Sequence, residues 1–148
     1  MDKLWDKGYS VDSELEAFTT ADDYLLDRDL VAWDCAASVA HARMLARCGI
    51  LSDDEAEKLA TELRAIAADA QAGSFEIKFE DEDGHTAIEK RLTARLGDLG
   101  KKIHTCRSRN DQVIAALRLW AKDALHTLFA ACLDLATTLR QFAEAHKD

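Results

Sequence analysis

The chain has 148 residues, of which 48% are hydrophobic and 32% charged, as expected for a single soluble globular domain. Its formal net charge of −9 excludes a broad basic surface, and with it nucleic acid or an anionic membrane as a general partner. The chain contains no proline and only six glycines. Because helix breakers are so few, the composition predicts an all-α fold.

The cysteines and the hydropathy pattern indicate a cytoplasmic protein. None of the four cysteines shows the C-x-x-C spacing of a metal or redox motif. Nothing at the N-terminus resembles a targeting segment. No apolar run approaches the ~20 residues that a membrane span requires. We therefore expect reduced thiols, no membrane association and a cytoplasmic location.

Three helical segments are expected in the first half of the chain. Residues 1–22 predict an irregular arm that contains a short helix. Residues 24–49 predict one helix, and residues 52–73 a second, opened by a capping box of Ser52 and Glu55 and ended by Gly73. The expected anchors of the arm are Trp5, Tyr9, Leu15 and Phe18, and the expected apolar stripe of the 24–49 helix is Leu26, Leu30, Trp33, Ala37, Ala40 and Met44.

Between these helices and the C-terminal part, the pattern changes twice. Residues 74–79 alternate apolar and polar side chains, which predicts a short extended segment that runs into an acidic turn at residues 80–83. Residues 84–97 predict a helix of about three turns, with Asp83 or Thr86 as its cap. Gly97 and Gly100 then indicate a loop.

Nothing interrupts the helical pattern from Asn110 to about Lys147. A helix of this length would extend roughly 55 Å, more than the diameter of a domain this size. We therefore divide the chain into an N-terminal helical domain, residues 1–109, and the first long helix of a central bundle, residues 110–148. The helix carries an apolar seam with alternating spacings of three and four, which predicts packing against helices that this chain does not contain or against other copies of the chain. The seam consists of Leu125, Leu128, Cys132, Leu135, Leu139 and Phe142.

The stretch "KKIHTCRSRNDQ", residues 101–112, places a basic loop directly before the long helix. Exposed backbone N–H groups and the helix dipole make such a position suited to an anion. Arg107 and Arg109 can bind carboxylates through two hydrogen bonds each, and Ser108 and Asn110 add polar groups. The alternative is structural: Asn110 caps its own helix and the arginines form surface ion pairs. Spacing alone leaves both open.

The stretch "EDEDGHTAIEKRL", residues 80–92, is the second candidate site. His85 and Glu89 lie one turn apart on the same helix face, as two metal ligands could. However, no second histidine falls at helical spacing from His85, so we expect no metal site and favour a solvated acidic turn. His104 precedes the basic loop and could hydrogen-bond a carboxylate, whereas His126 and His146 are expected on the surface of the long helix.

Both stretches resemble one known family. "GKKIHTCRSRNDQV" is similar to the signature H-T-G-R-S-R-N-D-Q of argininosuccinate lyases, a branch of the aspartase/fumarase superfamily, and "EDEDGHTAIEKRL" is similar to their E-D-x-H-T-x-I-E-x-x-L segment. The resemblance covers essentially all 148 residues. It implies reversible β-elimination of argininosuccinate to arginine and fumarate, a homotetramer, and neither a metal nor an organic cofactor. It also implies that a dicarboxylate is bound by Ser108, Arg109, Asn110, Arg107, His85, Asp83 and Thr86.

The chain also departs from the family pattern. Cys106 stands where the family usually has glycine, so we expect a loop without glycine-only torsions. Gly84 replaces a larger residue, which should loosen the turn before His85. The family's segments with the catalytic His and Ser have no counterpart here, so we expect the N-terminal part of a lyase that is inactive alone. The alternative is a non-catalytic, crystallin-like assembly module on the same scaffold.

Overall fold

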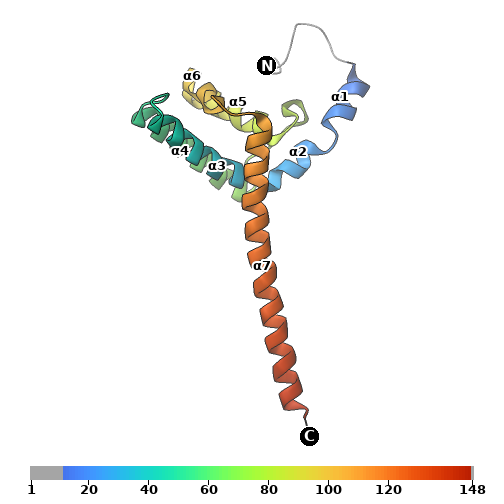
Figure 1. Ribbon diagram of the computed structural model, residues 1–148. Coiled ribbons are helices and arrows are strands. Elements are labelled where there is room, and N and C mark those ends of the chain that lie inside the picture. Colours follow the sequence, from blue (N-terminus) through green and yellow to red (C-terminus); the bar gives the residue numbers. More distant parts are fainter. Residues whose placement is uncertain (1–11, 148) are drawn as a thin grey trace. The chain divides into compact units, whose positions relative to one another are not determined.

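The computed structural model describes residues 12–147, which form helices and turns without any strand (Figure 1). The all-α prediction is thus confirmed for this part of the chain, while Trp5 and Tyr9 lie outside it. The longer helices are joined by single 3-10 turns at Asp27–Asp29, Phe79–Asp81 and Lys102–His104. The α-helices are α1 (Ser13–Thr20), α2 (Asp23–Leu26), α3 (Val31–Arg47), α4 (Asp53–Gln71), α5 (Gly84–Leu96), α6 (Asp98–Lys101) and α7 (Arg109–Ala145).

The segment predicted as one helix over residues 24–49 is divided into α2, a 3-10 turn and α3, so that prediction is wrong at its N-terminal end. At this break, the Asp27 carboxylate accepts a hydrogen bond of 2.8 Å from the backbone N–H of Gly84, which ties the turn to the start of α5. The short helix expected in the arm is present as α1, but Leu15 and Phe18 are exposed and do not act as anchors.

The buried face of α3 is also not the predicted stripe. Met44 is 41% exposed and Leu26 68% exposed, whereas the buried positions lie one step around the helix. Helices α3 and α4 pack side by side, and most of the buried side chains on α3 are small, which allows close approach. The buried residues of α3 are Val31, Asp34, Cys35, Ser38, Ala42 and Leu45.

Helix α4 begins as predicted. The Ser52 hydroxyl accepts a hydrogen bond of 3.1 Å from the N–H of Glu55, whose carboxylate accepts one of 2.8 Å from the N–H of Ser52. Its apolar side chains Leu59, Leu63 and Ile66 are completely buried. These side chains form the centre of the core together with Leu45 of α3 and Leu92 of α5.

The region between α4 and α7 is more helical than predicted. The segment expected to be extended contains no strand, although Ile77 is buried in the core. Asp83 caps α5, since its carboxylate accepts a hydrogen bond of 2.8 Å from the N–H of Thr86, as predicted. The loop expected around Gly97 and Gly100 instead contains α6, in which Gly100 lies directly on the backbone of α5.

The described part of the chain forms two compact units that divide between Leu117 and Arg118, and the first turns of α7 belong to the first unit. The predicted division at residues 109 and 110 concerns where a bundle helix begins, and it stays a prediction. Within residues 12–147, no helix combines the length and apolarity that crossing a membrane requires.

Candidate functional site

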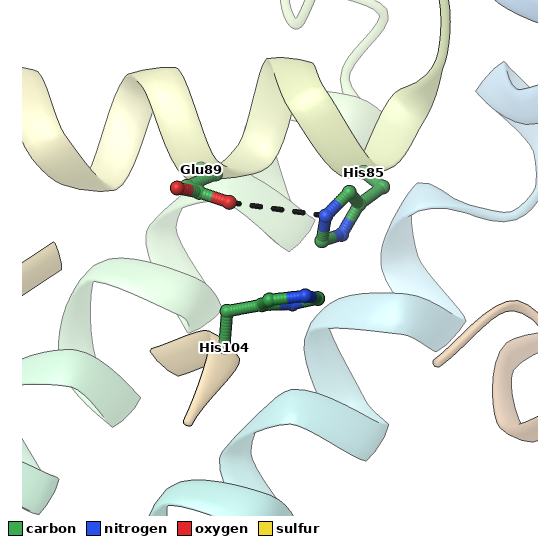
Figure 2. Close-up of side chains that lie close together, drawn as sticks. All are labelled: His85, Glu89 and His104. Carbon is green, nitrogen blue, oxygen red and sulfur yellow. Dashed lines mark ion pairs between the residues drawn. The ribbon is translucent and has the colours of Figure 1, made fainter. Parts of the chain in front are cut away.

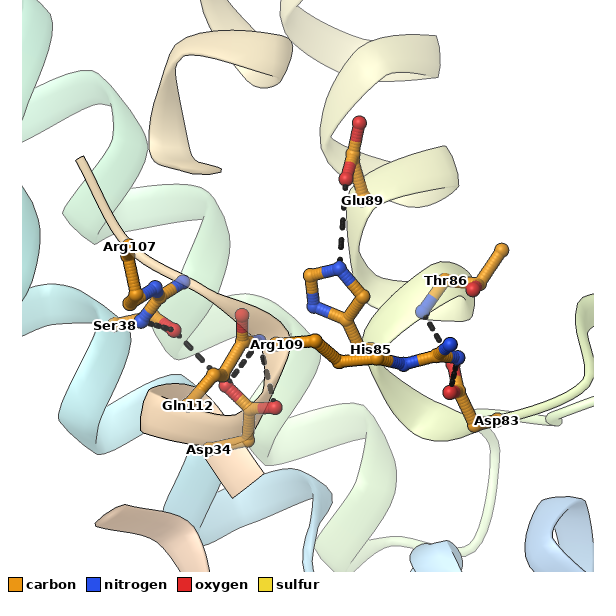
Figure 3. A network of polar contacts seen from close by, with 9 residues as sticks. All are labelled: Asp34, Ser38, Asp83, His85, Thr86, Glu89, Arg107, Arg109 and Gln112. Atoms are coloured by element: carbon orange, nitrogen blue, oxygen red, sulfur yellow. Dashed lines mark hydrogen bonds and ion pairs between the residues drawn. The ribbon is translucent and has the colours of Figure 1, made fainter. Parts of the chain in front are cut away.

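The two stretches singled out in the sequence meet in the first unit, at the N-terminal ends of α5 and α7. Asp83 joins them: one carboxylate oxygen caps α5 through Thr86, and the other pairs with the guanidinium Nη2 of Arg109 (Figure 3). Asp83, His85 and Thr86 are buried, whereas Ser108, Arg109 and Asn110 are exposed. The predicted site residues therefore form a buried wall from α5 and an exposed rim from the start of α7.

Ser108, rather than Asn110, caps α7. The Ser108 hydroxyl accepts a hydrogen bond of 3.2 Å from the N–H of Asp111, and the Asp111 carboxylate accepts one of 3.0 Å from the N–H of Ser108. Hydrogen bonds from Ser108 lower the pKa of Asp111. The structural alternative for Asn110 is therefore wrong. Its side chain is exposed and makes no hydrogen bond to other described residues, which leaves its amide available for a ligand.

A buried polar network lies beneath this loop. Both carboxylate oxygens of Asp34 lie 2.7 Å from Nε2 of Gln112, and one also accepts a hydrogen bond of 2.9 Å from Ser38. Arg107 points inward and donates from Nη1 to the Ser38 hydroxyl at 3.1 Å (Figure 3). Burial raises the pKa of Asp34 and lowers the pKa of Arg107. Arg107 thus holds the loop on α3 and lies apart from the exposed rim.

Two histidines, His41 and His104, contact residues around the basic loop. Nε2 of His41 lies 3.0 Å from the carbonyl oxygen of Thr105, which fixes the basic loop on α3. His104 does not hydrogen-bond a carboxylate, contrary to the expectation from its position; its ring packs on the ring of His85, with centroids 4.9 Å apart. Burial and the neighbouring His85 lower the pKa of His104.

The two departures from the family pattern have structural consequences that differ from expectation. Cys106 adopts a φ of 59°, so the loop keeps the left-handed conformation that glycine favours, at a cost of about 1–2 kcal/mol for a residue with a Cβ. The turn at Gly84 is held by Asp27 and not loosened. A Cβ at Gly84 would lie 3.2 Å from Cβ of Asp27, which shows how closely the two segments pack.

The cavity beside His85 is too small for a dicarboxylate. Its volume is about 20 Å³, enough for roughly one water molecule, and Asp34, Gly84 and His85 are among its lining residues. Pockets for small ligands typically enclose about 300–1,000 Å³. The rim residues Ser108, Arg109 and Asn110 do not line this cavity and are exposed on the surface.

Gln112→Leu is expected to reduce the free energy of unfolding by about 1.5–3 kcal/mol, because it removes the hydrogen bonds to the buried Asp34 carboxylate. These hydrogen bonds favour the ionised form of Asp34. The destabilisation caused by Gln112→Leu should therefore become smaller as the pH falls through the raised pKa of Asp34. Urea denaturation at two pH values measures both effects. Gln141→Leu, an exposed change on the same helix, is the control and should alter stability by less than about 0.5 kcal/mol.

The described residues form an all-α protein with exposed polar and basic side chains at the start of a long helix. A family model described as lyase matches residues 9–148, and the chain accordingly belongs to the lyase family. It is 48% identical to an argininosuccinate lyase of Thermotoga neapolitana over 97% of this chain and 36% of that protein. Identity is 50% to one of Sorangium cellulosum (85% of this chain, 29% of that protein) and 48% to one of Stenotrophomonas maltophilia (99% and 34%). The chain spans about a third of the length of these relatives.

Proposed function

We propose that the chain is the N-terminal, substrate-binding part of an argininosuccinate lyase, which cleaves argininosuccinate reversibly to arginine and fumarate. One observation carries this proposal beyond sequence similarity. Asp83 and Arg109, one from each stretch that resembles a family motif, lie more than twenty positions apart in the sequence, yet they form an ion pair. This pairing supports the proposal, because residues of both motifs lie together in the fold.

In this proposal the exposed rim binds the succinyl dicarboxylate. The Asn110 amide and the Ser108 hydroxyl donate hydrogen bonds, Arg109 pairs with a carboxylate, and the positive end of the α7 dipole adds to the attraction. β-Elimination proceeds by loss of a proton next to a carboxylate, and the negative charge that develops there requires such donors. Asp83 orients Arg109, and His85 and Thr86 shape the pocket wall.

The proposal assigns this chain substrate binding and not proton transfer, because none of its segments resembles those with the family's catalytic His and Ser. A shared active site follows naturally from the open surface, and we propose a homo-oligomer assembled through the apolar seam of α7. The seam is exposed in the second unit. We further propose a cytoplasmic location, which agrees with the four free cysteines.

The experiment that tests this function compares variants of the full-length protein in conversion of argininosuccinate, followed by the ultraviolet absorbance of fumarate. Asn110→Ala and Arg109→Ala should each lower kcat/KM by about 10- to 150-fold, since a hydrogen bond to a charged group contributes about 1.5–3 kcal/mol. Asn110→Ala should leave the stability within about 0.5 kcal/mol, because the side chain has no partner in the described chain.

The matched controls are Arg95→Ala and Gln141→Ala, which remove an exposed arginine and an exposed amide elsewhere. Both should keep unchanged kinetics. Absence of any fumarate from argininosuccinate would refute the proposed activity, while variants at residues 109 and 110 with the kinetics of the unmodified protein would refute the assigned site.

A further inference from the structure

Three side chains next to the candidate site form a compact cluster of potential metal ligands: His85, Glu89 and His104 (Figure 2). One ligand atom from each lies within 4.8 Å of the other two. His85 and Glu89 come from successive turns of α5, with Nε2 and Oε2 3.8 Å apart, and His104 approaches them from the 3-10 turn that precedes the basic loop. The sequence argument against a metal site required a second histidine at helical spacing, whereas the fold supplies it from another segment.

The environment of the cluster indicates a ligand-binding site and not a simple ion pair. His85 is only 8% exposed, and Nδ1 of His85 and Nδ1 of His104 are both buried without a hydrogen-bond partner among the described residues. Such buried polar atoms are uncommon, because each costs about 1–3 kcal/mol when unpaired.

We propose that His85, Glu89 and His104 bind a zinc ion. Two imidazoles and one carboxylate are a ligand set that zinc accepts, with a fourth position left for water or another ligand. Ligand atoms bonded to zinc at about 2.0–2.2 Å lie roughly 3.3–3.5 Å apart in tetrahedral geometry. The present separations, of up to 4.8 Å, are wider than this by up to about 1.5 Å, so binding of zinc would draw the side chains together.

Zinc binding by this cluster would be a property that the proposed lyase activity does not require. Zinc at this position would hold His85 against Glu89 and His104. His85 lies two positions along the chain from Asp83, which pairs with Arg109. The positive charge of Arg107 acts on His104 and opposes a cation there, whereas the Glu89 carboxylate favours one. We therefore expect zinc binding to depend on Glu89.

The test is isothermal titration of the 148-residue chain with zinc chloride, in a non-chelating buffer with a phosphine reductant. One zinc ion should bind per chain, and Glu89→Gln and His104→Gln should each weaken binding at least tenfold. Cobalt(II) should give the visible absorption of a tetrahedral site in the unmodified chain and lose it in both variants. Zinc should also raise the urea concentration at the unfolding midpoint of the unmodified chain, but not that of Glu89→Gln. The midpoint of Glu89→Gln without zinc shows whether the variant still folds, so loss of binding is distinguished from loss of folding.

Two control variants remove other zinc-binding side chains. His126→Gln deletes an exposed histidine of α7, and Cys106→Ser deletes the exposed thiol next to the loop. Both should bind zinc within twofold of the unmodified chain. The proposal is overturned if zinc does not saturate at one site, if Cys106→Ser abolishes binding, or if Glu89→Gln and His104→Gln bind zinc as tightly as the unmodified chain. Since binding is read directly, none of these outcomes depends on lyase activity.

Discussion

Replacing Gly100 by alanine is expected to destabilise the first unit by at least about 3 kcal/mol. A Cβ at this position would lie 2.5 Å from the carbonyl carbon of Leu92 and 2.5 Å from the amide nitrogen of Thr93. Overpacking in a well-packed region costs about 1–3 kcal/mol when side chains can adjust, and more when they cannot. Here the obstacle is the backbone of α5, so relief requires α6 to move away from α5. Urea denaturation followed by circular dichroism measures the loss.

Gly49→Ala is the matched control for this prediction. Gly49 has a φ of 73°, and a Cβ there would meet no atom within 4 Å, so alanine adds backbone strain without a clash. That strain costs about 1–2 kcal/mol. If Gly100→Ala proves no more damaging than Gly49→Ala, the close approach of α6 to α5 does not determine stability. The comparison matters for function, because α6 leads directly into the basic loop.

Features set by nearby residues could be predicted from the sequence. The capping box of α4 depends on Ser52 and Glu55 alone, and the Asp83 cap of α5 depends on a residue three positions ahead. The break before α3 was not predicted; it coincides with a hydrogen bond between Asp27 and Gly84, 57 residues apart, and such a long-range contact cannot be read from local sequence. The predicted apolar stripe of α3 is wrong for a similar reason: close packing on α4 selects small side chains such as Ser38 and Ala42, and hydrophobicity alone favours large ones.

In the candidate site, too, some features could be predicted from the sequence and others depend on long-range contacts. The sequence identified the two stretches that meet, through their charge pattern and their resemblance to a family. It did not identify Asp34, Ser38 or Gln112, whose hydrogen bonds connect residues up to 78 positions apart. The sequence did contain an indication of this polar network. Asp34 and Ser38 are polar residues four positions apart on the face of α3 that is otherwise apolar and buried. Polar residues on a buried helix face must find partners, and here Gln112 and Arg107 are those partners.

Substituting Leu128 and Leu135 together with glutamate is expected to abolish self-association of the chain. Both side chains are 60% exposed, and they lie within the seam of α7 described above. A row of six such side chains buries enough area on association to contribute several kcal/mol at ~25 cal/mol per Å². Contiguous apolar surfaces of this extent rarely stay uncovered in soluble monomers. The unmodified chain should therefore have the mass of two or more copies in size exclusion with light scattering, and the variant a smaller mass.

The width of the apolar surface on α7 predicts an assembly in which more than two helices pack together. Phe129 and Leu133 are also exposed, and at 3.6 residues per turn they extend the seam to about half of the helix circumference. A two-stranded coiled coil buries a narrower stripe, whereas a helix inside a bundle packs against neighbours on two sides. The control Thr127→Glu with Gln141→Glu adds the same charge on the opposite face of the helix and should keep the assembly intact. A monomeric unmodified chain, or equal disruption by both double variants, would show that the seam does not mediate association.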